Sequence, residues 1–187
     1  GMVPAALLGL DLDRLWNSAK EMLRACSPNI ASEMNPGAYM GAFMGALAQQ
    51  GRDKLTLFAS PTIAAFGAWV EQLVAESTGK DGMGVVPVVG EPIGKPHDYS
   101  TDRAFVYLKL EGDAGNDTLD EGVRALREAG HPRMTLTLPD AYALAGEFFR
   151  WEYATAIAGH LLKINPFDEP NVTESKQNTG RLLEYYV

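Results

Sequence analysis

Cysteine is almost absent from this 187-residue sequence, which contains only Cys26. A single cysteine cannot form an internal disulfide, which fits a reducing compartment, so we expect a cytoplasmic protein. The N-terminus lacks a basic segment ahead of its apolar run, and no signal peptide is predicted. The longest apolar stretch, residues 37–48, is shorter than the roughly 20 residues of a membrane-spanning helix, so no membrane association is expected.

Basic residues are also few, with 16 Lys and Arg against 24 Asp and Glu and a net charge of −8. Nucleic acid needs a basic face, so we exclude it as a partner. No glycine-rich dinucleotide or phosphate loop is found, and the histidines and the cysteine lack metal-ligand spacing, so we expect neither a cofactor nor a metal. A sugar phosphate is not excluded, because a local basic pocket can lie on an acidic protein.

Short apolar segments of strand type alternate with longer segments of helical periodicity. The predicted strands are residues 54–59, 84–89, 104–110 and 134–138. The predicted helices are residues 11–24, 35–51, 60–76, 120–129 and 141–162, with a last one from about residue 171. This order indicates one α/β domain over residues 1–187, a three-layer αβα sandwich with a mostly parallel, flavodoxin-like sheet of about five strands. Ligands of such sheets bind beyond the carboxyl ends of the strands, so we expect the site there.

Two spacings within the predicted helices suggest how those helices pack. Glycines four apart, at Gly37, Gly41 and Gly45, form a groove of small residues that another element can approach closely. Glu147 and Arg150 lie about one turn apart on the long fifth helix. For this pair we expect an ion pair on the helix surface.

Residues 71–80, at the end of the third predicted helix, hold the best candidate for acid–base chemistry. Gln72 and Glu76 are four apart and therefore share one face of the helix, and Gly79 turns the chain just beyond. The negative end of the helix dipole disfavours the charged form of a carboxylate there, which suits a group that removes and returns a proton. A helix end with solvated polar residues and a glycine stop explains the same pattern.

Two motifs resemble the C-terminal sugar-isomerase (SIS) domain of the glucose-6-phosphate isomerase family. The first is Glu-Ser-Thr-Gly-Lys-Asp-Gly at 76–82, followed by Val-Val-Pro-Val-Val-Gly-Glu-Pro at 85–92. The second is Ile-Asn-Pro-Phe-Asp-Glu-Pro-Asn-Val-Thr-Glu-Ser-Lys at 164–176. The opening Met-Val-Pro-Ala-Ala-Leu-Leu-Gly-Leu at 2–10 is similar to the form in which a transaldolase is fused ahead of the isomerase.

The resemblance implies an isomerase that interconverts glucose 6-phosphate and fructose 6-phosphate through an enediol. It implies that Glu76 is the base that carries the proton between carbons 1 and 2 and that Gln72 contacts the substrate. It also implies that Lys176 helps to open the sugar ring, so Glu76 and Lys176 should share one cleft. A solvated helix glutamine and a surface lysine are the ordinary alternatives for Gln72 and Lys176.

Two further positions match the family less closely. The family contributes a histidine after Gly-Glu-Pro to the site of the neighbouring subunit of a homodimer, and His97 is the matching candidate here. It stands one residue short of the family's position, so a loop histidine without function is equally compatible. The family's Phe-Asp-Gln has Glu169 at its third position here. Glu169 would contact the substrate, but it replaces an amide donor by a negative acceptor, which weakens the binding of an anionic ligand.

Other parts of the family's site have no counterpart in this sequence. The resembling enzymes hold the phosphate in a Ser/Thr-rich loop of a first sugar-isomerase domain, and they use an arginine that would lie just upstream of Met2. The chain therefore resembles the C-terminal half of an isomerase, with the upstream half or a transaldolase as partner, and little activity is expected of it alone. The alternative is a non-catalytic module on the same fold that binds phosphosugars or serves assembly.

Overall fold

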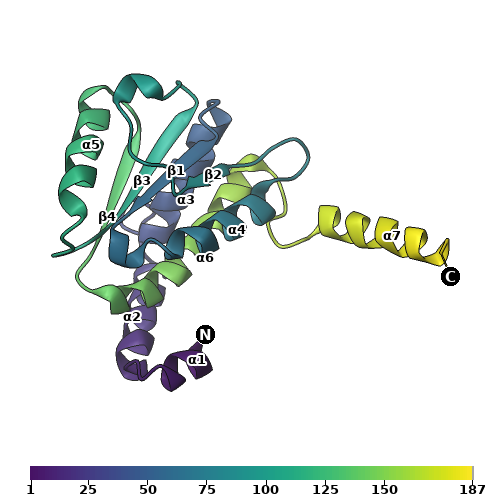
Figure 1. Ribbon diagram of the computed structural model, residues 1–187, viewed down its shortest axis with the longest axis horizontal. Helices are drawn as coiled ribbons and strands as arrows, with labels where there is room; N and C mark the ends of the chain where they lie inside the picture. The colour runs from purple at the N-terminus through teal and green to yellow at the C-terminus, as the bar shows by residue number, and fades with distance from the viewer. Residues whose placement is uncertain (187) are drawn as a thin grey trace.

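A computed structural model describes residues 1–186 and shows one parallel β-sheet between layers of helices (Figure 1). The sheet has four strands in the order β2-β1-β3-β4, one fewer than the five or so expected. Their bounds are β1 Lys54–Ala59, β2 Val86–Val89, β3 Arg103–Leu110 and β4 Arg133–Leu138. All three pairings are parallel, which confirms the predicted α/β class and the four strand positions within two residues.

Seven α-helices and three short 3-10 helices connect or flank the strands in the described part of the chain. The α-helices are α1 Met2–Leu7, α2 Leu12–Ala25, α3 Pro36–Gln49, α4 Phe66–Thr78, α5 Asn116–Glu128, α6 Leu144–Leu162 and α7 Pro170–Glu184. The 3-10 helices are η1 Pro61–Ile63, η2 Pro96–Asp98 and η3 Ala141–Ala143. Among residues 1–186, no helix has both the length and the apolar character needed to cross a membrane.

Two apolar cores, one on each face of the sheet, hold the three layers together. The larger core joins α3, α4 and α6 to the sheet and includes the fully buried Trp151 of α6. The smaller core lies under α5, where Phe105 and Tyr107 of β3 meet Val123 and Leu126. Figure 1 shows α5 on one side of the sheet and α4 and α6 on the other. Strand β3 is buried on both faces because both cores use it, which explains its nearly continuous apolar sequence.

The glycine groove of α3 packs against α6, as its spacing predicts. A Cβ atom added at Gly41 would lie 2.5 Å from the backbone oxygen of Ala154, and one at Gly45 would lie 2.9 Å from the Leu161 side chain. These distances are shorter than normal van der Waals contact, so only glycine allows the two helices to approach this closely.

The expectation of a surface ion pair on α6 is wrong for Glu147. Its side chain is only 3% exposed, and Arg150, at 3.2 Å, is 17% exposed. Burial raises the pKa of Glu147 to about 7, although the positive charge of Arg150 acts in the opposite direction. The residue faces inward because α2 and α3 both pack on α6 and cover that side of the helix.

Candidate functional site

The site motif at the end of α4 lies at the amino edge of the sheet, and the expectation of the carboxyl edge is wrong. Helix α4 follows β1 and runs back, antiparallel to the strands, to the start of β2. The Thr78 hydroxyl joins the two elements, since it accepts a hydrogen bond from the Val85 N–H at 2.9 Å. Helix α6 runs back in the same way after β4, so the loop after α6 reaches the same edge.

The apolar stripe of α4 determines where Glu76 points. Val70, Val74 and Thr78 recur every four residues and are fully buried against the sheet. Glu76 lies away from this stripe, and the structure shows it exposed at the solvent side of the helix. Gln72 is also exposed, and its Nε2 lies 3.5 Å from Oε1 of Glu76, at the limit of a hydrogen bond.

A tight turn after α4 carries Lys80 inward. A Cβ atom at Gly79 would lie 2.8 Å from the backbone oxygen of Ala75, so glycine is needed where the helix ends. Asp81 and Gly82 then adopt positive φ angles of 54° and 72°. This turn reverses the chain, and the backbone N–H of Lys80 bonds to the backbone oxygen of Met83 at 3.0 Å.

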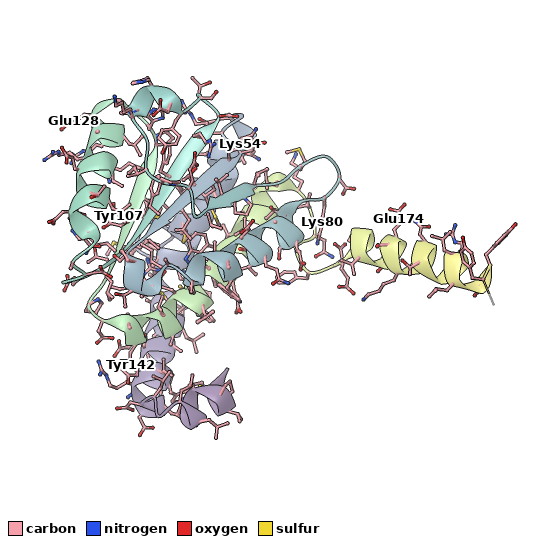
Figure 2. The ribbon with its side chains drawn as sticks, viewed as in Figure 1. Lys54, Lys80, Tyr107, Glu128, Tyr142 and Glu174 are labelled. Carbon is pink, nitrogen blue, oxygen red and sulfur yellow. The ribbon has the colours of Figure 1, made fainter. Side chains whose placement is uncertain are left out.

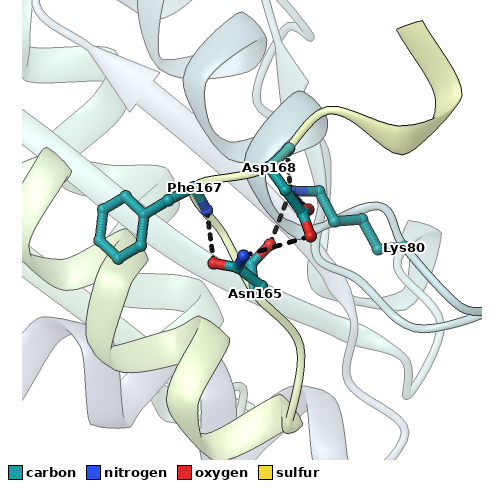
Figure 3. Close-up of polar contacts among 4 residues, drawn as sticks. All are labelled: Lys80, Asn165, Phe167 and Asp168. Carbon is teal, nitrogen blue, oxygen red and sulfur yellow. Dashed lines mark hydrogen bonds and ion pairs between the residues drawn. The ribbon is translucent and has the colours of Figure 1, made fainter. Parts of the chain in front are cut away.

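The ammonium group of Lys80 is buried and holds the loop that follows α6 (Figure 3). It donates to the backbone oxygen of Asn165 at 2.7 Å, to the backbone oxygen of Asp168, and to Oδ1 of Asp168 at 2.8 Å. These three bonds use all three donors of the ammonium group. The Lys80 hydrogen bond holds the pKa of the Asp168 carboxyl below its usual range. Asn165 supports the same turn, because its Nδ2 donates to Oδ2 of Asp168 at 3.2 Å.

This tie brings the two sequence motifs around one cavity of about 440 Å³, which we call the Glu76 cavity. Its lining includes Glu76 and Ser77 from the first motif and Phe167 and Glu169 from the second. Three carboxylates, those of Glu76, Asp168 and Glu169, face one lysine whose donors are already used. The cavity can therefore accept protons and hydroxyl donors, but none of the described residues that line it offers an uncommitted side-chain cation to a phosphate.

Lys176 is not brought to this cavity. It is exposed on α7, which projects away from the sheet (Figure 1), and the cavity lining ends at Val172. In this structure the predicted shared cleft therefore holds Glu76 and Glu169 but not Lys176.

His97 lies in η2, on the connection between β2 and β3, and is likewise absent from the cavity lining. Its side chain is 78% exposed, with Nε2 3.5 Å from Oδ1 of Asp98. Within residues 1–186, no group of three or more His, Cys, Asp or Glu side chains is arranged to hold a metal ion.

No role for Lys80 or Asp168 is predicted from the sequence. Both belong to the quoted motifs, yet a lysine and an aspartate are ordinarily surface residues, and nothing in the spacing pairs positions 88 residues apart. The available signal was a lysine after a helix-ending glycine, between two buried segments. Figure 2 shows Lys80 where the end of α4 meets the chain that leads to α7.

Sequence comparison finds relatives named glucose-6-phosphate isomerase. The chain is 33% identical to the protein of that name from Symbiobacterium thermophilum, 31% to that from Pediococcus pentosaceus and 27% to that from Enterococcus faecalis. Each alignment covers 98% of this chain but only 48% or 49% of the relative. The chain thus spans about half the length of the curated relatives that it matches. No protein-family model matches it.

The fold has a counterpart among solved structures. The crystal structure of a hypothetical protein from Thermus thermophilus superposes with a TM-score of 0.82 over 98% of this chain and 53% of the other. The two sequences are 22% identical, so this likeness establishes the fold alone.

Proposed function

We propose that this chain is the base-bearing part of a sugar-phosphate isomerase that interconverts glucose 6-phosphate and fructose 6-phosphate. The observation that carries the proposal is the set of three hydrogen bonds made by Lys80. They hold two motifs that are far apart in sequence on either side of the Glu76 cavity. The names of the relatives support the choice of substrate.

Glu76 acts as the general base in this proposal. Its carboxylate removes the proton from carbon 2 of the open-chain aldose, the electron pair forms the enediol, and the carbonyl oxygen on carbon 1 gains a proton. The same carboxyl group then returns the first proton to carbon 1. The hydroxyl on carbon 2 loses its proton as it becomes the ketose carbonyl, which balances the proton gained by the oxygen on carbon 1. One exposed carboxylate suffices if both carbons lie within its reach, with Gln72 and Glu169 beside it to contact the hydroxyl groups.

In this proposal phosphate binding belongs to another part of the assembly, because the Glu76 cavity is negatively charged. Lys80 balances the Asp168 carboxylate, but those of Glu76 and Glu169 have no ion-pair partner among the described residues and would repel the phosphate dianion, so the sugar enters with its carbon 1 and carbon 2 end toward Glu76. The phosphate is held by groups outside this chain. The upstream half of the isomerase, or a transaldolase fused to the chain, supplies these groups. A homodimer would place His97 of one subunit in the site of the other, and the protein acts in the cytoplasm.

The test uses a chimera in which this chain replaces the matching half of the Symbiobacterium thermophilum relative. A coupled assay of fructose 6-phosphate formation should show turnover by the chimera and almost none by the chain alone. Glu76→Gln should reduce turnover by about 10²–10⁴-fold, the usual contribution of a general base. Glu71→Gln is the control, because Glu71 is also exposed on α4 but does not line the Glu76 cavity.

The second candidate is a phosphosugar-binding or assembly module without catalysis. The acidic Glu169 and the position of Lys176, which is exposed on α7 and outside the lining of the Glu76 cavity, favour it. A folded chimera that binds fructose 6-phosphate but does not turn it over would support this candidate and contradict the isomerase.

A further inference from the structure

A second groove, on the opposite face of the sheet from α4, lies between α5 and the edge strand β4. It measures about 320 Å³, and four of the side chains that line it are cationic: Lys109, Arg124, Arg127 and Arg133. We call it the arginine groove. It shares no lining residue with the Glu76 cavity.

The strand register explains why these groups converge. Residues two apart on a strand share a face, so Arg133, Thr135 and Thr137 of β4 all face the α5 side, and Thr137 pairs with Lys109 of β3. Thr135 and Thr137 remain exposed, whereas Met134, Leu136 and Leu138 between and beside them are buried on the other face. One wall of the groove is therefore the open face of an edge strand.

Helix α5 supplies the other wall. Val123 and Leu126 point into the smaller core, and Arg124 and Arg127, three residues apart, lie together beside them at the solvent boundary. Figure 2 labels Tyr107, which lies under α5 at the floor of the groove. Guanidinium groups from a helix and a strand thus face one space.

The positive charge of the groove is only partly balanced. Asp120 is the one acidic lining residue, and Lys109 Nζ binds it at 2.6 Å. Arg124 has Glu121 at 4.0 Å, the outer limit of an ion pair. Neither Arg127 nor Arg133 has an ion-pair partner among the described residues. The chain as a whole carries a net charge of −8, yet this groove is positive, and like charges that converge without counter-ions repel one another.

We propose that the arginine groove binds a small phosphate ester. Arginine presents a planar fork that matches phosphate oxygens, and the two threonine hydroxyls offer further donors on the strand. The volume suits a small metabolite, since ligand sites begin at about 300 Å³. The arginine groove is separate from the Glu76 cavity, so this proposal does not depend on whether the chain is part of an isomerase.

The test is a titration of the ¹⁵N-labelled chain with glycerol 3-phosphate at constant ionic strength, followed by amide NMR shifts. We expect saturable shifts at residues 124–127 and 133–137, and no saturable shift there with glycerol, which lacks the phosphate. The double variant Arg127→Gln/Arg133→Gln should raise the Kd at least about tenfold, because it removes two charge-assisted contacts. Arg133→Lys, which keeps the charge but loses the fork, should give an intermediate Kd.

Arg24→Gln is the matched control, because Arg24 is exposed on α2, which packs on α6 on the other side of the sheet from α5. Linear, non-saturating shifts, or equal weakening by Arg24→Gln, would show general attraction of anions and overturn the proposal. Saturable binding of a hexaglutamate peptide, with no response to glycerol 3-phosphate, would also overturn the proposal. The edge strand would then be a binding site for an acidic peptide.

Discussion

Lys80 Nζ lies 2.8 Å from Oδ1 of Asp168, and the two residues are 88 positions apart along the chain. The lysine side chain is 4% exposed and the aspartate side chain 50% exposed, so the bond reaches from the protein interior to its surface. It fixes the loop after α6 against the end of α4. The position of Glu169 relative to Glu76 therefore depends on a residue that does not itself carry out the proposed reaction.

Lys80→Met should loosen this loop without unfolding the protein. Methionine keeps the length of the side chain but leaves two backbone oxygens and the Asp168 carboxylate without their donor. Hydrogen bonds to a charged group contribute about 1.5–3 kcal/mol, and half-exposed Asp168 can recover some of this from water, so we expect a loss of roughly 2 kcal/mol. Hydrogen exchange should accelerate at residues 164–169, and the pKa of Asp168 should rise toward its usual range.

Lys54→Met provides the comparison, because Lys54 bonds Asp53 and Asp102 at a more exposed position, 38% by side chain. It should leave exchange at residues 164–169 unchanged. If Lys80→Met leaves both exchange and the Asp168 titration unaltered, the loop is held by its own turn, through Asn165, and not by the lysine.

The buried carboxyl of Glu147 should make stability depend on pH near neutrality. Its pKa of about 7 in the folded protein exceeds the ordinary value of 4.5, so the folded state retains the proton at higher pH than the unfolded state does. The protonated carboxyl therefore contributes to the free energy of unfolding. This stabilising contribution is complete below about pH 4.5 and is lost as the pH rises through about 7. The difference between the two pKa values corresponds to a change of about 3 kcal/mol in the free energy of unfolding.

Urea unfolding from pH 5 to pH 8 measures this effect. The parent chain should lose stability over the interval, whereas Glu147→Gln, which cannot ionise, should show a flatter profile. Glu152→Gln, an exposed change on the same helix, should keep the parental slope. Parallel profiles for the parent and Glu147→Gln would mean that the ion pair with Arg150 keeps the carboxylate charged.

The contact between α3 and α6 leads to a third prediction. Gly41→Ala places a methyl group 2.5 Å from a backbone oxygen that can move only if the helix moves, so overpacking should cost about 1–3 kcal/mol. Gly180→Ala on α7 meets nothing within 4 Å and should be neutral or stabilising by up to about 1 kcal/mol, because alanine favours a helix. Thermal unfolding of the two variants gives the comparison, and a stable Gly41→Ala would contradict the close approach.

The fold was accessible from sequence because each element is encoded by neighbouring residues. Alternating strand and helix periods are local properties, and so are caps such as Asn35, whose side chain accepts from the Ala38 N–H. The glycine groove of α3 could be predicted for the same reason. The resemblance of two motifs identified the segments that line the Glu76 cavity, although the edge of the sheet was predicted wrongly because α4 and α6 both return to the amino edge.

The remaining features depend on contacts between distant segments, which periodicity does not encode. Lysine and glutamate are ordinarily surface residues, so the sequence does not indicate that Lys80 and Glu147 are buried. Their burial follows from the packing of α6 and of the loop after it. The convergence of Arg127 and Arg133 likewise follows from the placement of α5 beside an edge strand. Motif order likewise does not encode the direction of α7, which keeps Lys176 outside the lining of the Glu76 cavity in this structure.

The last prediction concerns α7, which must move if Lys176 opens the sugar ring. The helix has 15 residues, and strongly exposed apolar side chains lie in its last turn and just after its end, namely Leu182, Leu183, Tyr185 and Tyr186. Isolated helices of this length are marginally stable in water, and such side chains ordinarily pack against a partner. We expect α7 to turn about the segment near Pro170 and bring Lys176 toward Glu76 when the chain is completed in the chimera and fructose 6-phosphate binds.

Spin labels at Glu71→Cys on α4 and Gln177→Cys on α7 measure this movement, and buried Cys26 remains unlabelled. The distance between the labels should be long in the isolated chain and shorter in the liganded chimera. A second pair, Glu71→Cys with Arg24→Cys, lies on the body of the domain and should not change. A catalytically active chimera in which the first distance stays long would remove Lys176 from the mechanism and leave ring opening to another group, while the role of Glu76 as base would stand.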